Sequence, residues 1–252
     1  MTQLTLVALR GIPLVQPGDD LARLILDALN TNEVVLQPGD SLVVTSKIVS
    51  KAEGRIVHLR DVTPTERALE LAARTGKDPR VIELVLQESR SVSRVAPHVL
   101  VVEHRLGFVS ANAGIDQSNL ENGDEKVLLL PIDPDESARI IRQSLFESVG
   151  VQVGVIISDS HGRPFRLGNI NVAIGVAGMP ALVDLRGQSD LFGRPLKISI
   201  QGYADMVASA AGLLTGEGAE GLPIVLVRGL TYPAIDGRAS EINRPPAQDL
   251  YR

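Results

Sequence analysis

The chain has 252 residues, 44% of them hydrophobic, which is enough to bury a substantial core in one large domain or two closely joined ones. Its formal charge is -5 with no basic stripe, and its 3% aromatic content leaves few side chains to stack on bases, so nucleic-acid binding is disfavoured. There are no cysteines, which excludes disulfides, thiolate metal sites and a cysteine nucleophile and fits a reducing compartment.

The N-terminal residues MTQLTLVALRGIPLV lack the features of a signal peptide, and no apolar run reaches the roughly 18 residues of a membrane span. We therefore expect a cytoplasmic protein. Short branched or apolar runs predict strands over residues 4–9, 41–46, 99–102, 127–130, 151–158, 172–176, 181–185 and 224–227.

Capping residues and helical spacing predict the helices between these strands. They begin at Asp19 or Asp20, at Thr63 with Pro64 as first helical residue, at Asp78, at Asp133 and at Tyr203. The expected ends of the second and fourth helices are Gly76 and Gly150. Several strands follow one another directly, so a mixed α/β or α+β fold is predicted instead of a regular doubly wound sheet. A weak boundary signal lies at residues 76–95.

In the stretch VGVIISDSHGRPFRLG, residues 153–168, an apolar run is followed by a polar cluster. Asp159 and Ser160 follow the predicted strand, and a carboxylate with a hydroxyl at a strand end commonly presents oxygen ligands to Mg²⁺ or Mn²⁺. For this segment the metal-binding interpretation is slightly favoured. His161 is the one histidine placed in such a cluster.

Four other segments combine permissive backbone with polar or cationic groups, and each has a plain structural alternative. Residues 11–14 are more typical of a simple exit from a strand, and residues 45–54 fit a loop with two solvated lysines equally well. The second segment is not a Walker A loop, because the glycines before the lysine are missing. Asp116 in residues 110–119 is typical of an Asx turn, and residues 215–221 of a helix C-cap. Spacing alone indicates a divalent-metal enzyme acting on phosphates.

Taken together and in this order, the segments resemble the coenzyme F420-0:L-glutamate ligase family, the gamma-glutamyl ligases. The matching stretches are GIPLVQPGDDL, VVTSKIVSKAEGR, ANAGIDQSN, VIISDSHGRPFRLG, NVAIGVAGMPALVDLRGQSDLFGRPL and ASAAGLLTGEGAEG, with a similar tail, DGRASEINRPPAQDLYR. The resemblance implies a ligase that consumes GTP to phosphorylate the carboxylate of coenzyme F420-0 and then joins it to L-glutamate. It also implies an unusual α+β fold and an intertwined homodimer.

The resemblance also implies which residues bind GTP and metal. The residues expected at GTP are Ile12, Pro13, Leu14, Val15, Ser46, Lys47, Lys51, Asn119, Thr215, Gly216, Glu217, Gly218, Ala219, Glu220, Gly221 and Leu222. Asp116 and Asp159 are expected to hold one divalent cation, Mg²⁺ or Mn²⁺, and Ser160 and Glu217 a second. Lys51 and Asp159 are the expected catalytic residues. A requirement for K⁺ is left open.

Other expectations concern the acceptor and the extent of the chain. His161, Arg163 and Arg166 are candidates for contacts with anionic groups of the acceptor. Some relatives carry a C-terminal nitroreductase-like domain, whereas residues 1–252 are expected to form a single stand-alone ligase unit, whether or not it divides into two subdomains. A metal-dependent phosphohydrolase and a GTP-binding sensor without catalysis are the alternative functions.

Overall fold

Helices and strands are interleaved along the chain in the computed structural model, which describes residues 3–121, 123–233 and 235–249. The helices are α1 (Leu21–Thr31), α2 (Ser46–Ala52), α3 (Glu66–Thr75), α4 (Pro79–Gln87), α5 (Pro134–Val149) and α6 (Tyr203–Thr215). The strands are β1 (Thr5–Ala8), β2 (Ser41–Thr45), β3 (Ile56–His58), β4 (Ser89–Ala96), β5 (Val99–His104), β6 (Val109–Ala111), β7 (Lys126–Leu128), β8 (Gly154–Arg163), β9 (Arg166–Ala177), β10 (Leu182–Asp184), β11 (Ile200–Gly202) and β12 (Ile224–Arg228). The last three residues of the tail that resembles the family lie outside the described residues.

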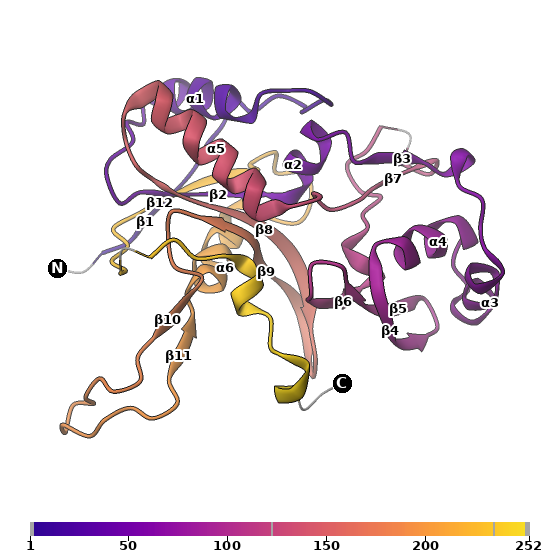
Figure 1. Ribbon diagram of the computed structural model, residues 1–252. Helices are drawn as coiled ribbons and strands as arrows, with labels where there is room; N and C mark the ends of the chain where they lie inside the picture. The colour runs from indigo at the N-terminus through magenta and orange to yellow at the C-terminus, as the bar shows by residue number, and fades with distance from the viewer. Residues whose placement is uncertain (1–2, 122, 234, 250–252) are drawn as a thin grey trace.

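A five-stranded sheet in the order β1-β12-β2-β8-β9 forms the centre of the larger lobe (Figure 1). Strands β2 and β8 are parallel, and the other neighbours are antiparallel. Helices α1 and α5 cover one face and α6 covers the other (Figure 1). The predicted mixed α+β fold is confirmed. In the described part of the chain, no helix has the length and hydrophobicity needed to cross a bilayer.

The sheet is buried on both faces, which explains its nearly continuous apolar strands. In β2, Val43 packs in the core under α6, while Leu42 and Val44 pack in the core under α1 and α5. In β8, Ile156 and Ile157 divide between the two cores in the same way. Because side chains alternate between faces, this packing specifies the register of both strands.

The smaller lobe contains α3 and α4, the sheet β4-β5-β6 and the pair β3-β7. It has its own core, in which Leu71 of α3, Ile82 of α4 and Val102 of β5 meet. The weak boundary signal at residues 76–95 falls inside this core, because Val85 and Val92 both pack in it. That segment therefore does not separate the two lobes.

Helix ends follow the capping signals closely, with one exception. Gly76 and Gly150 both end helices in the left-handed conformation, at φ +71° and +70°, as their predicted C-cap role requires. The predicted start of α3 is wrong by two residues, because Thr65 and not Thr63 accepts the hydrogen bond from Ala68 N. Thr65 is held there by Glu83 of α4, whose Oε2 accepts from both its backbone N–H and its hydroxyl.

Two further sequence predictions, for residues 45–54 and for the end of β8, are corrected. Residues 45–54 were expected to form a loop, but Ser46 to Ala52 form helix α2, in which Ile48 and Val49 are buried. Strand β8 does not end at Ser158. It runs on to Arg163, because β9 pairs with it along its whole length, with a register shift between Ile157 and Ser158. Asp159, Ser160 and His161 therefore lie within a strand.

An arm projects from the larger lobe between β9 and α6. Strands β10 and β11 form its base, and residues 185–199 form its outer part (Figure 1). Backbone hydrogen bonds order the arm, including Gly187 N to Leu196 O at 2.9 Å and Asp190 N to Arg194 O at 2.8 Å. The arm exposes Leu191 and Phe192 at its tip and Ile198 nearer its base, and these side chains are 99%, 87% and 88% exposed.

Candidate functional site

A cavity of about 820 Å³ lies where the carboxyl end of β2 and the middle of β8 meet the smaller lobe. All five segments singled out from the sequence line it, although they are far apart along the chain. The predicted residues that line it are Ile12, Pro13, Leu14, Val15, Ser46, Lys47, Lys51, Asp116, Asn119, Asp159, Ser160, Thr215, Gly216, Glu217, Gly218, Ala219, Gly221 and Leu222. Of the residues predicted to bind GTP or metal, Glu220 alone is absent from this lining.

The parallel pairing of β2 with β8 places two of these residues side by side. Thr45, the last residue of β2, is opposite Ser158, so the next residues, Ser46 and Asp159, leave this pair together. The Ser46 hydroxyl donates to Oδ1 of Asp159 at 2.6 Å. This bond joins α2 to β8 across 113 positions of sequence.

Lys47 forms an ion pair with Asp116 on the opposite wall. Lys47 Nζ lies 2.7 Å from Oδ2 of Asp116 and donates to the Ser118 hydroxyl, also at 2.7 Å. Burial alone would raise the pKa of Asp116, but the hydrogen bonds from Lys47 and Ser118 outweigh it and lower the pKa. The Asp116 carboxylate is thus ionised and ready to hold a cation.

Asn119 links Lys51 of α2 to the glycine-rich loop over residues 215–222. Lys51 Nζ donates to Asn119 O at 2.8 Å, and Asn119 Nδ2 donates to Gly218 O at 3.1 Å. Burial and the nearby positive charge of Lys47 lower the pKa of Lys51. Two lysines on consecutive turns of α2 therefore concentrate positive charge beside backbone groups of the loop over residues 215–222, which suits a polyphosphate.

Ser160 and Glu217 meet on the wall formed by β8 and the loop after α6. The Ser160 hydroxyl lies 2.8 and 2.9 Å from the two oxygens of the Glu217 carboxylate, to which it donates. Glu220 instead turns back onto its own loop and accepts from Gly218 N at 2.8 Å. It thereby shapes the loop and leaves Glu217 as the carboxylate at the cavity.

The donor set fits hard divalent cations, because Asp116, Asp159, Ser160 and Glu217 offer oxygen only. Among the described residues, however, no group of three or more Asp, Glu or His side chains is close enough to hold an ion by itself. The carboxylates are instead paired with Lys47, Ser46 and Ser160. Such a site needs oxygens from water or substrate to complete the coordination of each cation.

Three serines on this wall were given no role by the sequence. Ser118 orients Asp116, since its backbone N–H donates to Oδ1 at 2.7 Å, and the Asp-x-Ser pattern of an Asx turn signals this contact. Ser50 and Ser158 are each 1% exposed, line the cavity, and have hydroxyls without a hydrogen-bond partner in the described part of the protein. Buried hydroxyls of this kind favour a bound ligand as the missing partner.

The acceptor candidates lie further along the β8–β9 hairpin. His161 Nε2 is 3.1 Å from Oδ2 of Asp159, so its ring contacts the cavity wall from behind. Arg163 donates to Leu167 O at 3.3 Å near the hairpin tip, and Arg166 begins β9 beside it. Neither arginine lines the cavity.

The model of the F420-0:gamma-glutamyl ligase family matches residues 11–229, a range that contains every residue of the cavity wall described above. This chain belongs to that family. Three proteins named coenzyme F420:L-glutamate ligase are similar to it along nearly their whole length. The one from Methanopyrus kandleri is 48% identical over 94% of this chain and 93% of its own. Those from Methanothermobacter thermautotrophicus and Archaeoglobus fulgidus are 45% and 46% identical, over 99% and 96% of this chain and 99% and 94% of their own.

Proposed function

We propose that the protein is a GTP-dependent ligase that adds L-glutamate to coenzyme F420-0, and that it acts in the cytoplasm. Its relatives are named coenzyme F420:L-glutamate ligase, and this supports the substrate pair. The observation that carries the proposal is the convergence of Lys47, Lys51 and three carboxylates on one cavity of about 820 Å³. That combination of charges fits a nucleoside triphosphate with its metal ions.

In this reaction the acceptor carboxylate attacks the γ-phosphorus of GTP, so that GDP leaves and an acyl phosphate forms. The amino group of L-glutamate then attacks the acyl carbon, phosphate leaves, and an amide bond results. Lys51 and Lys47 stabilise the negative charge that develops on the phosphoryl oxygens, and the backbone of residues 215–222 holds the nucleotide. No reactant is oxidised or reduced in either step.

Two divalent cations, Mg²⁺ or Mn²⁺, fit the acidic groups. Asp116 and Asp159 would hold one cation, and Ser160 and Glu217 the other. When bound, these ions would neutralise the triphosphate and help to align its γ-phosphoryl group. Ser46 would keep Asp159 oriented through its 2.6 Å hydrogen bond.

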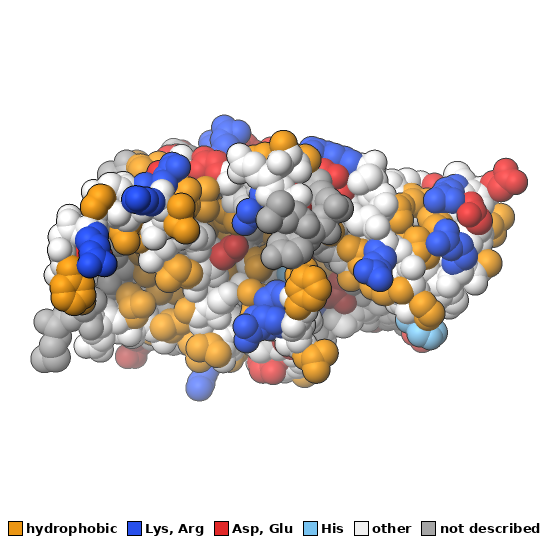
Figure 2. All heavy atoms as spheres, turned by 90° about the horizontal axis from the view of Figure 1, so that it is seen from below, with side chains coloured by type: hydrophobic (Ala, Val, Ile, Leu, Met, Phe, Trp, Pro, Cys, Tyr) orange, Lys and Arg blue, Asp and Glu red, His pale blue; other side chains and the backbone are white. Residues whose placement is uncertain are grey.

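We also propose that the protein is a homodimer in which the arm of one copy packs on the other. Figure 2 shows the face from which the arm projects, and apolar side chains are spread over it. The exposed Leu191, Phe192 and Ile198 would be buried by such an exchange. A symmetric pair of copies is the commonest way to cover a surface of this kind.

The test of the activity is a reconstitution with coenzyme F420-0, L-glutamate, GTP and Mn²⁺, followed by mass spectrometry. We expect a product carrying one added glutamate, with GDP released in equal amount and only when all substrates are present. Steady GDP release without acceptor and glutamate would instead identify a phosphohydrolase. Binding of GTP with no product and no GDP would identify a nucleotide sensor.

A further inference from the structure

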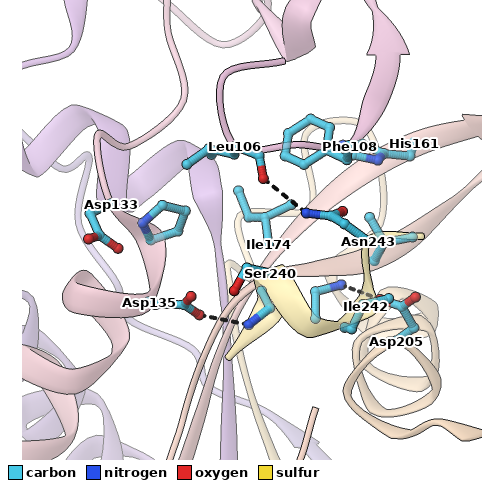
Figure 3. Close-up of a pocket in the computed structure, with 14 residues that line it drawn as sticks. Leu106, Phe108, Asp133, Asp135, His161, Ile174, Asp205, Ser240, Ile242 and Asn243 are labelled. Carbon is cyan, nitrogen blue, oxygen red and sulfur yellow. Dashed lines mark hydrogen bonds between the residues drawn. The ribbon is translucent and has the colours of Figure 1, made fainter. Parts of the chain in front are cut away.

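The turn between β5 and β6, residues 105–108, inserts from the smaller lobe against the larger one. Asn243 Nδ2 donates to Leu106 O at 2.9 Å (Figure 3). Gly107 has a φ of +95°, and a Cβ on it would lie 2.9 Å from Asn243 Nδ2. The contact therefore depends on glycine at this position, and it ties the turn to the C-terminal segment of the larger lobe.

Three rings from the two lobes stack behind this turn. The Phe108 ring lies 4.9 Å from the His104 ring, at an interplanar angle of 6°, and 4.8 Å from the tilted His161 ring. Phe108 and His161 adjoin in Figure 3, at the wall of a small cavity of about 170 Å³. We call His104, Phe108 and His161 the ring column. His104 and Phe108 belong to the smaller lobe and His161 belongs to β8 of the larger.

The base of the ring column is rigidly held. His104 is fully buried, and its Nδ1 accepts from Leu106 N at 3.0 Å. Arg105, next in the chain, donates to Glu88 and to the carbonyl of Pro131, each at 2.9 Å. The column therefore starts from a well-anchored point of the smaller lobe.

The other end of the ring column meets Asp159. His161 Nε2 is 3.1 Å from Oδ2 of Asp159, yet the ring is turned so that no hydrogen bond forms, and Nε2 has no such partner in the described part of the chain. Nε2 is also within ion-pair distance of the carboxylate, and the ring limits the space open to Asp159. Since Ser46 holds Oδ1 from the other side, the carboxylate is confined between the hydroxyl and the ring.

Asp116, the proposed partner of Asp159 at a cation, belongs to the other lobe. Its backbone pairs with Leu128 of β7 in both directions, at 3.0 and 2.8 Å. The smaller lobe also approaches Asp159 at Gly114, where a Cβ would lie 3.5 Å from Oδ2 and 2.8 Å from Leu130 Cδ1. The distance between the two carboxylates is consequently set by how the lobes pack together.

We propose that Phe108 and His161 are positioning residues, which fix the spacing of Asp116 and Asp159 through the ring column and so determine the affinity for the divalent cation. This inference rests on the proposed function, because it needs a cation held by those two carboxylates. The ring of His161 carries the effect, and its nitrogen does not.

The experiment titrates Mn²⁺ into the full chain without nucleotide and measures free Mn²⁺ by electron paramagnetic resonance. We expect Phe108→Ala and His161→Ala to raise the Kd for Mn²⁺ about 10- to 100-fold, the usual effect of losing support behind a metal ligand. His161→Phe keeps a ring against Phe108 and should keep the Kd within about threefold of wild type. Phe108→Leu serves where Phe108→Ala does not fold, and it should also raise the Kd.

Tyr232→Ala is the matched control. It breaks another aromatic pair, Tyr203 with Tyr232 at 5.7 Å, away from the cavity, and should lower stability in urea without changing the Kd for Mn²⁺. Wild-type affinity in folded Phe108→Ala or Phe108→Leu would overturn the inference, as would equal losses in His161→Phe and His161→Ala. A wild-type chain that binds no Mn²⁺ would instead refute the proposed metal site itself, and the inference with it.

Discussion

Lys47 Nζ and Asp116 Oδ2 lie 2.7 Å apart and join helix α2 to the loop after β6 across the mouth of the cavity. Lys47 is paired with the carboxylate that a divalent cation needs, and the same lysine is proposed to bind a phosphate of GTP. Ligand-free protein thus keeps opposite charges paired, and a cation that binds without substrate has to compete with Lys47 for Asp116. When substrate and metal bind, Lys47 would pair with a phosphate oxygen and Asp116 would pair with the cation.

Lys47→Met should therefore change two affinities in opposite directions. Mn²⁺ alone should bind roughly fivefold more tightly, because removing the competing ammonium is worth about 1 kcal/mol. GTP should bind more weakly, because one phosphate contact is lost. Calorimetric titrations measure both constants, and Lys77→Met removes the same charge elsewhere as a control. Unchanged Mn²⁺ affinity would show that Lys47 does not compete for Asp116.

Asp159→Asn should retain the fold and lose activity by at least about 100-fold, since an amide cannot balance a cation at a phosphate site. The amide oxygen can still accept from Ser46, so little loss of stability is expected. Product formation and thermal unfolding are measured on the same preparation. Asp27→Asn on the surface of α1 is the control. Wild-type turnover in Asp159→Asn at saturating metal would remove this residue from the mechanism.

Glu88 should make the protein less stable as the pH falls into the acidic range. Burial alone would raise its pKa, but His104, Arg105 and Arg55, which face the carboxylate, together lower the pKa to about 2. Because the folded-state pKa lies below the ordinary 4.5, the stabilisation is complete above about pH 4.5 and is lost as the pH falls towards 2.

Glu88→Gln should accordingly lower the free energy of unfolding by about 3 kcal/mol at pH 7, with a difference from wild type that shrinks between pH 4.5 and 2. Urea unfolding at several pH values measures it. Glu70→Gln, in an exposed pair with Arg67, should cost less than about 1 kcal/mol. A difference for Glu88→Gln that stays constant down to pH 2 would contradict the assigned pKa.

The arm offers a direct test of assembly. Phe192→Asp places a charge on the tip, and we expect it to convert the dimer to a monomer, because burying an unpaired carboxylate is unfavourable. Light scattering after size-exclusion chromatography reports the mass. Val35→Asp, at an equally exposed apolar residue outside the arm, should leave the dimer intact. A wild-type chain that is already monomeric would refute the proposed dimer.

Local signals predicted the parts of the fold that depend on neighbours in sequence. Asp20 and Asp133 cap α1 and α5, and Gly150 ends α5, because capping is decided within one turn of the chain. Helix α2 was missed because its seven residues are too few to show a clear period, and two of them, Ile48 and Val49, are typical of strands. The continuation of β8 through Asp159 depends on pairing with β9, which no local pattern records.

The site itself shows the same division. The local pattern at Asp159 and Ser160 predicted oxygen ligands, and both residues line the cavity, but the pattern gave no partner for either residue. Ser46 and Asp159 meet across 113 positions, a contact that depends on strand order and register. Family resemblance supplied the set of residues, and it assigned Glu220 to GTP although its carboxylate turns into its own loop. The ring column was missed because its members carry no shared motif.

The pairing of β2 with β8 also limits how this protein can change. Thr45 lies opposite Ser158, and each strand is packed on both faces immediately before that point. Inserting or deleting one residue in either strand would turn the following side chains to the opposite face and separate Ser46 from Asp159. Variation in length should therefore accumulate in surface segments such as residues 185–199, while these two strands tolerate substitutions of similar volume and no insertions.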